Sequence, residues 1–194
     1  MLKKLIVKLY GTCYSLRNYN RLVIIMDPTA LVANTVIKRS LEKGYEITSV
    51  KLQKLVYFLF KRYLQVNKRL LFKEPFEVWE KGPVVPSIYE KFSSGSRGKR
   101  IEQYKQDGSI FIVNPDNLDF YKALDFVILT YGDWSAEELS EATHVEGGAW
   151  HLALKKNNRY IFVEDIANER WVINKEELGD LPVEDLSESE WSDA

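Results

Sequence analysis

Two histidines and two glutamates in the C-terminal half carry side chains of the kind that bind metal ions. His144 and His151 are seven residues apart, with Glu141 and Glu146 close to them. Imidazole and carboxylate are common zinc ligands, so a metal site is one interpretation. A pair of glycines follows Glu146, however, and interrupts the helix that would align the two imidazoles, and no metalloprotease spacing is present. We therefore expect no bound metal and predict that His144 makes a structural hydrogen bond near a helix start.

Groups suited to covalent catalysis or phosphate binding are not convincingly placed. The single cysteine, Cys13, lies in a stretch without a recognisable period, and no serine occupies a strand-to-helix elbow. Gly95 and Gly98 are not followed by the helix that a phosphate-binding loop requires. The carboxylates are abundant but scattered, so no acid–base pair can be assigned. We expect no catalytic residue, no cofactor and no enzymatic activity.

Basic side chains could follow a nucleic-acid phosphate backbone. The candidates are Lys51, Lys54, Lys61, Arg62, Arg97, Lys99 and Arg100. The simpler interpretation is that the first four form the solvated face of a helix and the last three lie in a soluble loop. The net charge of −1 also lacks the basic excess of a dedicated nucleic-acid-binding protein. A DNA-binding regulator of its own operon is thus the alternative function, and the sequence disfavours it.

Three aromatic residues are candidates for contact with another protein, because large rings lose little entropy on binding. Trp150 is better explained as a core residue. Trp79 precedes the turn at residues 81–83, which proline stiffens and which should run near the surface. Tyr89 lies on the short helix that follows this turn. A protein-binding surface around Trp79 and Tyr89 is therefore the most specific chemistry that the residues offer.

The elements that position these residues are mostly helices. Asp27 and Pro28 are suited to start a helix that Gly44 ends, and Thr48 is suited to cap a second, strongly amphipathic one. Gly132 should end a helix that begins after Pro115, and Ser135 with Glu138 forms a capping-box pattern. Short helices are expected at residues 86–92, 150–154 and 164–170.

Strand signals are few and short. Residues 77–80 are extended in character, and residues 70–72 read as a short strand or a packed loop. Asp107 and Gly108 form the favoured two-residue hairpin turn, here between residues 101–106 and 109–113. A last strand is expected at residues 160–163. The predicted fold class is α+β, a mainly helical single domain with a small antiparallel sheet.

The two ends of the chain differ in charge from its body. Residues 1–25 carry five basic side chains and no acid, and show no period; we expect a disordered arm or an extension upstream of a start at Met26. Residues 176–194 carry eight acids and no base, and we expect a mobile tail within residues 173–194. No signal peptide or bilayer-spanning run is apparent, and cysteine is rare, which favours a cytoplasmic protein without membrane contact. The domain is expected at residues 26–172.

Several blocks of sequence, in this order, resemble one known family. They are residues 51–57 (KLQKLVY), 76–79 (FEVW), 82–89 (GPVVPSIY), 131–140 (YGDWSAEELS) and 143–150 (THVEGGAW). Together they are similar to the SocA-like family, also called the Panacea domain, formerly a domain of unknown function linked to the phage protein GepA. The resemblance covers about residues 26–172, and neither charged end belongs to its pattern.

The resemblance implies an antitoxin of a toxin–antitoxin system, whose partner is a cognate toxin protein bound directly. It also implies that one type of member acts as an adaptor delivering its toxin to the ClpXP protease, and no catalytic residues are known for the family. We expect the toxin-binding candidates to be Trp79, Gly82, Pro83, Val84, Pro86 and Tyr89, with Lys51, Gln53 and Lys54 as nearby polar contacts. The sequence does not indicate the oligomeric state.

Overall fold

The computed structural model describes residues 27–93, 100–106 and 108–179, and the backbone of four short strands nearer the N-terminus. These strands pair as two antiparallel hairpins, β1 (Ile6–Leu9) with β2 (Thr12–Ser15) and β3 (Asn18–Tyr19) with β4 (Leu22–Val23). The sequence shows no strand period over residues 1–25, although these four stretches form strands. Strands of two to four residues offer too few alternating positions for a period to be recognised.

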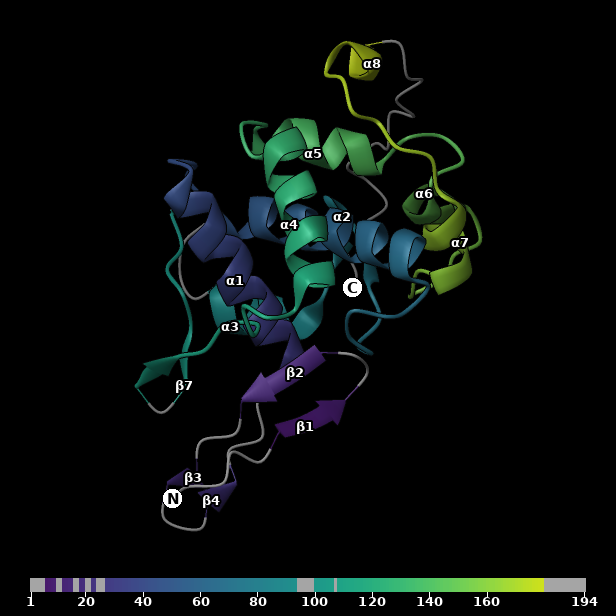
Figure 1. Cartoon of the computed structure of the whole chain (residues 1–194). Helices are drawn as coiled ribbons and strands as arrows, with labels where there is room; N and C mark the ends of the chain where they lie inside the picture. Colours follow the sequence, from purple (N-terminus) through teal and green to yellow (C-terminus); the bar gives the residue numbers. More distant parts are fainter. Residues whose placement is uncertain are drawn as a thin grey trace.

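The helix α2 (Ser49–Asn67) is the element around which the other helices pack, and it is buried on all sides over most of its length. Figure 1 shows it crossing the middle of the helical body. Among the helices that contact it are α1 (Pro28–Glu42), α4 (Leu118–Tyr131), α5 (Ala136–Thr143) and α7 (Val163–Asn168). Because α2 is enclosed, each polar side chain on it needs a partner inside the protein.

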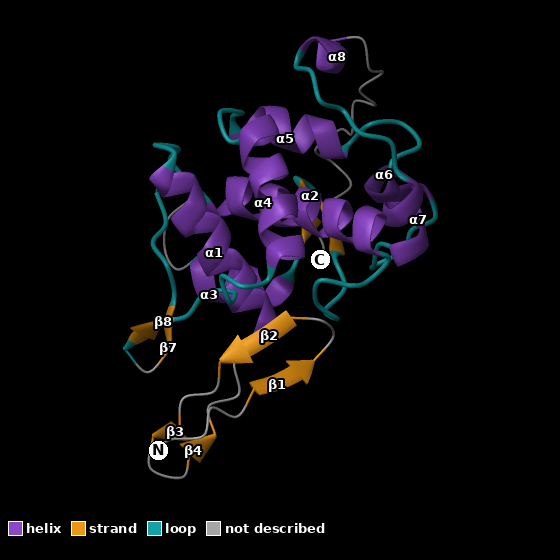
Figure 2. Cartoon of the chain, viewed as in Figure 1, coloured by secondary structure: helices purple, strands orange, loops and turns teal. Residues whose placement is uncertain are grey.

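Strands form only short antiparallel pairs, as Figure 2 shows, so the predicted mainly helical α+β class is confirmed. The remaining described elements are β5 (Glu77–Trp79), β6 (Gly82–Val84), α3 (Pro86–Phe92), β7 (Lys105–Gln106), β8 (Ser109–Ile110), α6 (Ala149–Lys155) and α8 (Glu176–Gly179). The hairpin β5–β6 and the helix α3 that follows it lie against α2. They carry most of the residues that we predicted to bind a toxin.

The predicted helix boundaries are confirmed wherever a capping residue marks them. Asp27 accepts a hydrogen bond from the amide of Thr29 at 2.9 Å, and Pro28 is the first residue of α1. Thr48 caps α2, and Ser135 with Glu138 forms the capping box of α5. Such signals depend on neighbouring residues alone and are therefore readable without knowledge of the fold.

Other boundaries differ from the prediction, mainly because strands are shorter than their sequence signals. Residues 70–72 form a packed loop rather than a strand, and β7 and β8 pair only two residues each on either side of the turn. Tyr160 makes a single bridge to β5, while Val163 already begins α7. Helix α8 shows that the predicted mobile tail does not begin at Glu176. Asp107 and residues 180–194 lie outside the described part.

A buried ionic cluster fastens the segment after α7 to α2. The ammonium nitrogen of Lys61 lies 3.2 Å from a carboxylate oxygen of Glu169, and both side chains are buried. The hydroxyl of Tyr57 donates to the same oxygen at 2.6 Å, and Lys61 also donates to the carbonyl of Arg170 at 2.6 Å. Burial raises the pKa of the Tyr57 hydroxyl well above its usual value, so it remains a donor. The cluster joins residues more than 100 positions apart in the sequence.

Replacing Glu169 with glutamine should destabilise the protein strongly, because the Lys61 ammonium would stay buried without its carboxylate partner. Breaking a buried pair in this way costs about 3–5 kcal/mol. The control is Asp119→Asn, which breaks the half-exposed pair with Arg69 and should cost about 1 kcal/mol or less. Urea unfolding of both variants measures the free energies. Equal losses for the two variants would contradict the structural role assigned to Glu169.

Candidate functional site

Two side chains of α2 hold the hairpin β5–β6 from below. The amide of Gln53 bonds the backbone of Val85 twice: its nitrogen donates to the carbonyl at 3.2 Å and its oxygen accepts from the backbone N–H at 3.0 Å. The ammonium of Lys54 donates to the carbonyl of Pro83 at 2.9 Å. Both side chains are buried. These three bonds fix the path of the chain from β6 into α3.

The lysines of α2 do not form the solvated face that we predicted. Lys51, Lys54 and Lys61 are all buried, and Lys51 donates to the carbonyl of Gly132 at 2.8 Å. Arg62 is half-buried, with its guanidinium carbon 4.1 Å from the ring centroid of Phe126. The prediction was wrong because helical periodicity identifies one apolar face but does not reveal that other segments cover the opposite one.

Gly82 is required by its surroundings as well as by its backbone. Its φ of +95° lies in a region that favours glycine. A Cβ atom there would stand 2.9 Å from the ammonium of Lys54 and even closer to the hydroxyl of Thr143. Gly82, Pro83 and Val84 are buried, so our prediction that this side of the turn lies at the surface was wrong. Hydrogen bonding to α2 holds β6 in the interior. Residues 82–84 therefore lie beneath the surface in the unbound chain and are not part of it.

Three of the predicted candidates do reach the surface, and we call Trp79, Pro86 and Tyr89 the hairpin surface. Trp79 and Pro86 are half-buried, while the side chain of Tyr89 is 45% exposed. The rings of Trp79 and Tyr89 lie with their centroids 4.9 Å apart. The indole N–H of Trp150, a core residue as predicted, donates to the carbonyl of Trp79 at 3.0 Å. A half-buried and an exposed ring are thus in contact at the surface, and the backbone of the first is bonded to the core.

Residues 159–161 pair with β5 on its other edge, and we did not assign them to this region from the sequence. The amide of Val78 donates to the carbonyl of Arg159 at 3.0 Å, and the amide of Ile161 donates to the carbonyl of Phe76 at 2.9 Å. Tyr160 lies directly opposite Glu77 in this pairing. The alternation of exposed and apolar residues after Asn158 was a strand signal, but nothing local in the sequence indicates which strand it joins.

His144 stacks on a core tryptophan and feels the charge of Lys54. Its ring stacks on Trp150 with centroids 4.0 Å apart, and its Nε2 is buried without a hydrogen-bond partner in the part of the chain that the structure describes. His144 ends α5, so the hydrogen bond predicted near a helix start is not made. Burial, and then the charge of Lys54, lower the pKa of His144 to about 4.

The described residues contain no group of three or more His, Cys, Asp or Glu side chains that could hold a metal ion. His151, the second histidine of the pair, accepts a hydrogen bond at Nδ1 from the amide of Gly147 at 3.0 Å. Burial likewise lowers the pKa of Lys54 well below its usual value. The region around His144 and Lys54 is therefore one where added positive charge is disfavoured.

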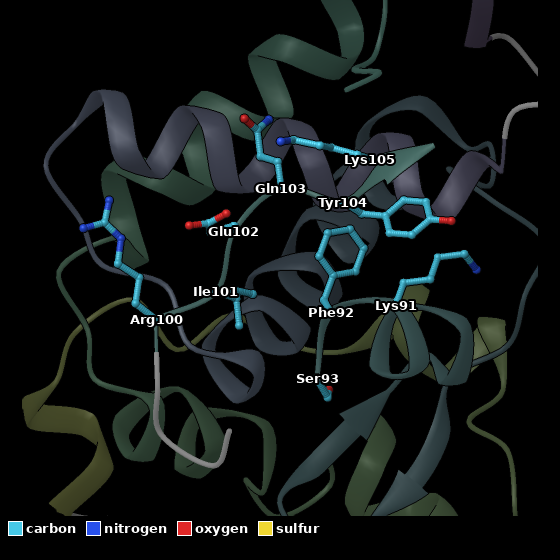
Figure 3. A pocket seen from close by; sticks show the side chains of 9 residues that line it. All are labelled: Lys91, Phe92, Ser93, Arg100, Ile101, Glu102, Gln103, Tyr104 and Lys105. Carbon is cyan, nitrogen blue, oxygen red and sulfur yellow. The ribbon is translucent and has the colours of Figure 1, made fainter. Parts of the chain in front are cut away.

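An open pocket of about 400 Å³ lies between the end of α3 and the segment leading to β7. Figure 3 shows the rings of Phe92 and Tyr104 beside each other in its lining, with Lys91 and Arg100 at its margin. Lys91 pairs with Asp27 at 2.8 Å, so its charge is matched. Arg97 and Lys99 lie outside the described residues. Of the predicted basic group, Arg100 is the one described member that is exposed.

Acid should destabilise the protein through His144, because the folded-state pKa is about 4 and the unfolded value is about 6.5. The unfolded chain then binds the proton more tightly, so stability is complete above pH 6.5 and falls as the pH decreases towards 4. His144→Phe, which keeps a ring against Trp150, should remove about 2 kcal/mol of the loss between pH 7.5 and pH 5. His151→Phe is the control and should retain that loss. Parallel pH profiles for wild type and His144→Phe, measured by urea unfolding, would refute the assignment.

Two comparisons with known proteins, one with family models and one with individual sequences, agree on the same family. The family model described as "Antitoxin SocA-like, Panacea domain" matches residues 52–151, which include most of α2, the hairpin, α3 and α5. Antitoxin SocA of Caulobacter vibrioides (strain NA1000 / CB15N) is 33% identical over 138 residues, covering 66% of this chain and 73% of that protein. No solved structure matches the chain significantly. No helix in the described part is long and apolar enough to cross a bilayer. The chain belongs to the SocA-like antitoxin family with a Panacea domain.

Proposed function

We propose that this chain neutralises a cognate toxin by direct protein binding at the hairpin surface. Membership of an antitoxin family supports a toxin partner. The observation that carries the location is the ring pair of half-buried Trp79 and exposed Tyr89, in which the backbone of Trp79 is tied to the core. Exposed aromatic side chains on rigid backbone are typical of residues that dominate protein interfaces.

Rigidity is the physical reason for favouring this surface over other exposed apolar residues. Binding loses free energy when side chains and loops must be ordered, so a surface that is already ordered binds more tightly for the same contacts. Gln53 and Lys54 supply this order, since they bond the backbone of Val85 and Pro83. Their proposed role in toxin binding is therefore to position the hairpin. Both side chains are buried in the unbound chain and so are not accessible to a toxin there.

The alternative function, a DNA-binding regulator, has less support in the described part of the chain. Three of its predicted phosphate contacts, Lys51, Lys54 and Lys61, are buried and already bonded to backbone carbonyls. A gel-shift titration at two salt concentrations separates the two functions, because binding through phosphates weakens steeply with salt.

Neutralisation can proceed by occlusion of the toxin or by its delivery to a protease such as ClpXP, in either case in the cytoplasm. The two differ in the fate of the toxin. Occlusion leaves its half-life in the cell unchanged when the antitoxin is present. Delivery shortens the half-life, and deletion of the protease restores it. A pulse-chase measurement of the toxin in both backgrounds decides between them.

Alanine at Trp79 or at Tyr89 should weaken toxin binding about fivefold or more, because truncation of an aromatic anchor costs about 1 kcal/mol or more. The probe is the protein encoded by the reading frame adjacent to this gene, tested by titration and by rescue of growth on co-expression. Leu129→Ala is the matched control, since Leu129 is 72% exposed on α4. Val84 is a poor test residue because it is buried.

Thermal unfolding of each variant completes the design. Weaker binding by Trp79→Ala and Tyr89→Ala, with melting temperatures close to wild type, supports the hairpin surface. Wild-type affinity in both variants would exclude it as the toxin contact, whatever Leu129→Ala does.

A further inference from the structure

The segment 158–162 has one edge paired with β5 and one that faces away from it. The inward edge is defined by the carbonyl of Arg159 and the amide of Ile161, which bond Val78 and Phe76. In a strand, the N–H and C=O of one residue point to the same side, and those of the next residue point to the opposite side. The amide and the carbonyl of Tyr160 therefore point to the outer edge.

The outer edge offers a short row of backbone groups that the described part of the chain does not pair. Tyr160 contributes both its N–H and its C=O, and Phe162, extended with φ −75° and ψ 139°, contributes its N–H. The row is bounded by α6 and α7: the amide of Asn158 donates to the carbonyl of Ala153 at 2.9 Å, and the carbonyl of Phe162 accepts from Ile166 at 3.2 Å. The edge is thus short but has the donor and acceptor spacing of a strand.

The side chains on this edge are exposed and aromatic. Tyr160 is 43% and Phe162 is 51% exposed, while Ile161 between them is buried in the core. Natural proteins usually protect an open strand edge with a charged or proline residue, or by covering it. An edge flanked by two exposed rings is instead suited to receive another strand, since the rings can pack on alternate side chains of the added segment.

The edge is continuous with the hairpin surface through Glu77. One carboxylate oxygen of Glu77 accepts from the guanidinium of Arg159 at 2.9 Å, and the other accepts from the indole N–H of Trp79 at 2.8 Å. The ring of Trp79 in turn lies against that of Tyr89. One partner could therefore contact the aromatic pair and the open edge at the same time.

We propose that the toxin adds an extended segment of its own backbone, as a further β-strand, along residues 160–162. This deepens the proposed function and rests on it. The occupant is a polypeptide because the edge presents donors and an acceptor at strand spacing, whereas a nucleic-acid phosphate backbone offers acceptors alone. A second copy of this chain is the competing occupant, and self-association distinguishes it.

Two substitutions at one position isolate the backbone contribution. Phe162→Ala removes the ring and keeps the amide N–H, whereas Phe162→Pro removes the ring and the N–H together. The observed φ of −75° suits proline, and this amide makes no bond inside the described protein, so both variants should fold. Binding of the adjacent reading frame's product should be about three- to tenfold weaker for Phe162→Pro than for Phe162→Ala.

Hydrogen exchange of the backbone amides tests strand addition directly, because a contact made by side chains alone would not add a hydrogen bond to the amide of Tyr160. The amide of Tyr160 should exchange freely in the isolated chain and become protected in the complex. Equal affinity of the proline and alanine variants, with an unprotected Tyr160 amide in a complex that still forms, would overturn strand addition and leave the proposed function intact. Failure of the wild-type chain to bind this probe would overturn both. Protection that depends on the concentration of the isolated chain would assign the edge to a second copy and reject the toxin as occupant.

Discussion

The enclosure of α2 is the constraint on which the rest of the molecule depends. A helix buried on all sides cannot leave an ammonium group unpaired, because burying an uncompensated charge costs several kcal/mol. Each of its three buried lysines reaches a backbone carbonyl in a different segment, at Gly132, Pro83 and Arg170. One arrangement of the surrounding segments thus packs the apolar side chains of α2 and gives each buried lysine a hydrogen-bond acceptor, while Lys61 also pairs with the carboxylate of Glu169.

This arrangement explains which features could be read from the sequence. Helix starts at Pro28 and Ser49 depend on adjacent capping residues, and the hairpin turn before Pro83 depends on local backbone preferences, so these were predictable. The burial of Lys51 and Lys54 depends on carbonyls that lie about 30 to 80 positions away. Periodicity within a helix carries no information about such distant partners, and the lysines were consequently predicted to be solvated.

The blocks that resemble the family are mostly structural in this chain. Gln53 and Lys54 hold the backbone at Val85 and Pro83, and Gly82 is glycine because neighbouring side chains leave no room for a Cβ atom. A family that shares these residues shares a scaffold. On the proposed function, recognition of a particular toxin would fall to residues that the scaffold exposes, and of the motif residues named as candidates Trp79, Pro86 and Tyr89 reach the surface. Their contact with a toxin stays a prediction.

The strand β5 joins the two parts of the proposed interface. It carries Trp79 on one side of the region and pairs with the segment around Tyr160 on the other, while its own carbonyl at Trp79 is held by the buried indole of Trp150. Its position between these partners means that neither surface can move far without disturbing a bond to the core. A toxin that binds both surfaces would therefore meet groups already in place, and most of the free energy of contact would remain available as affinity.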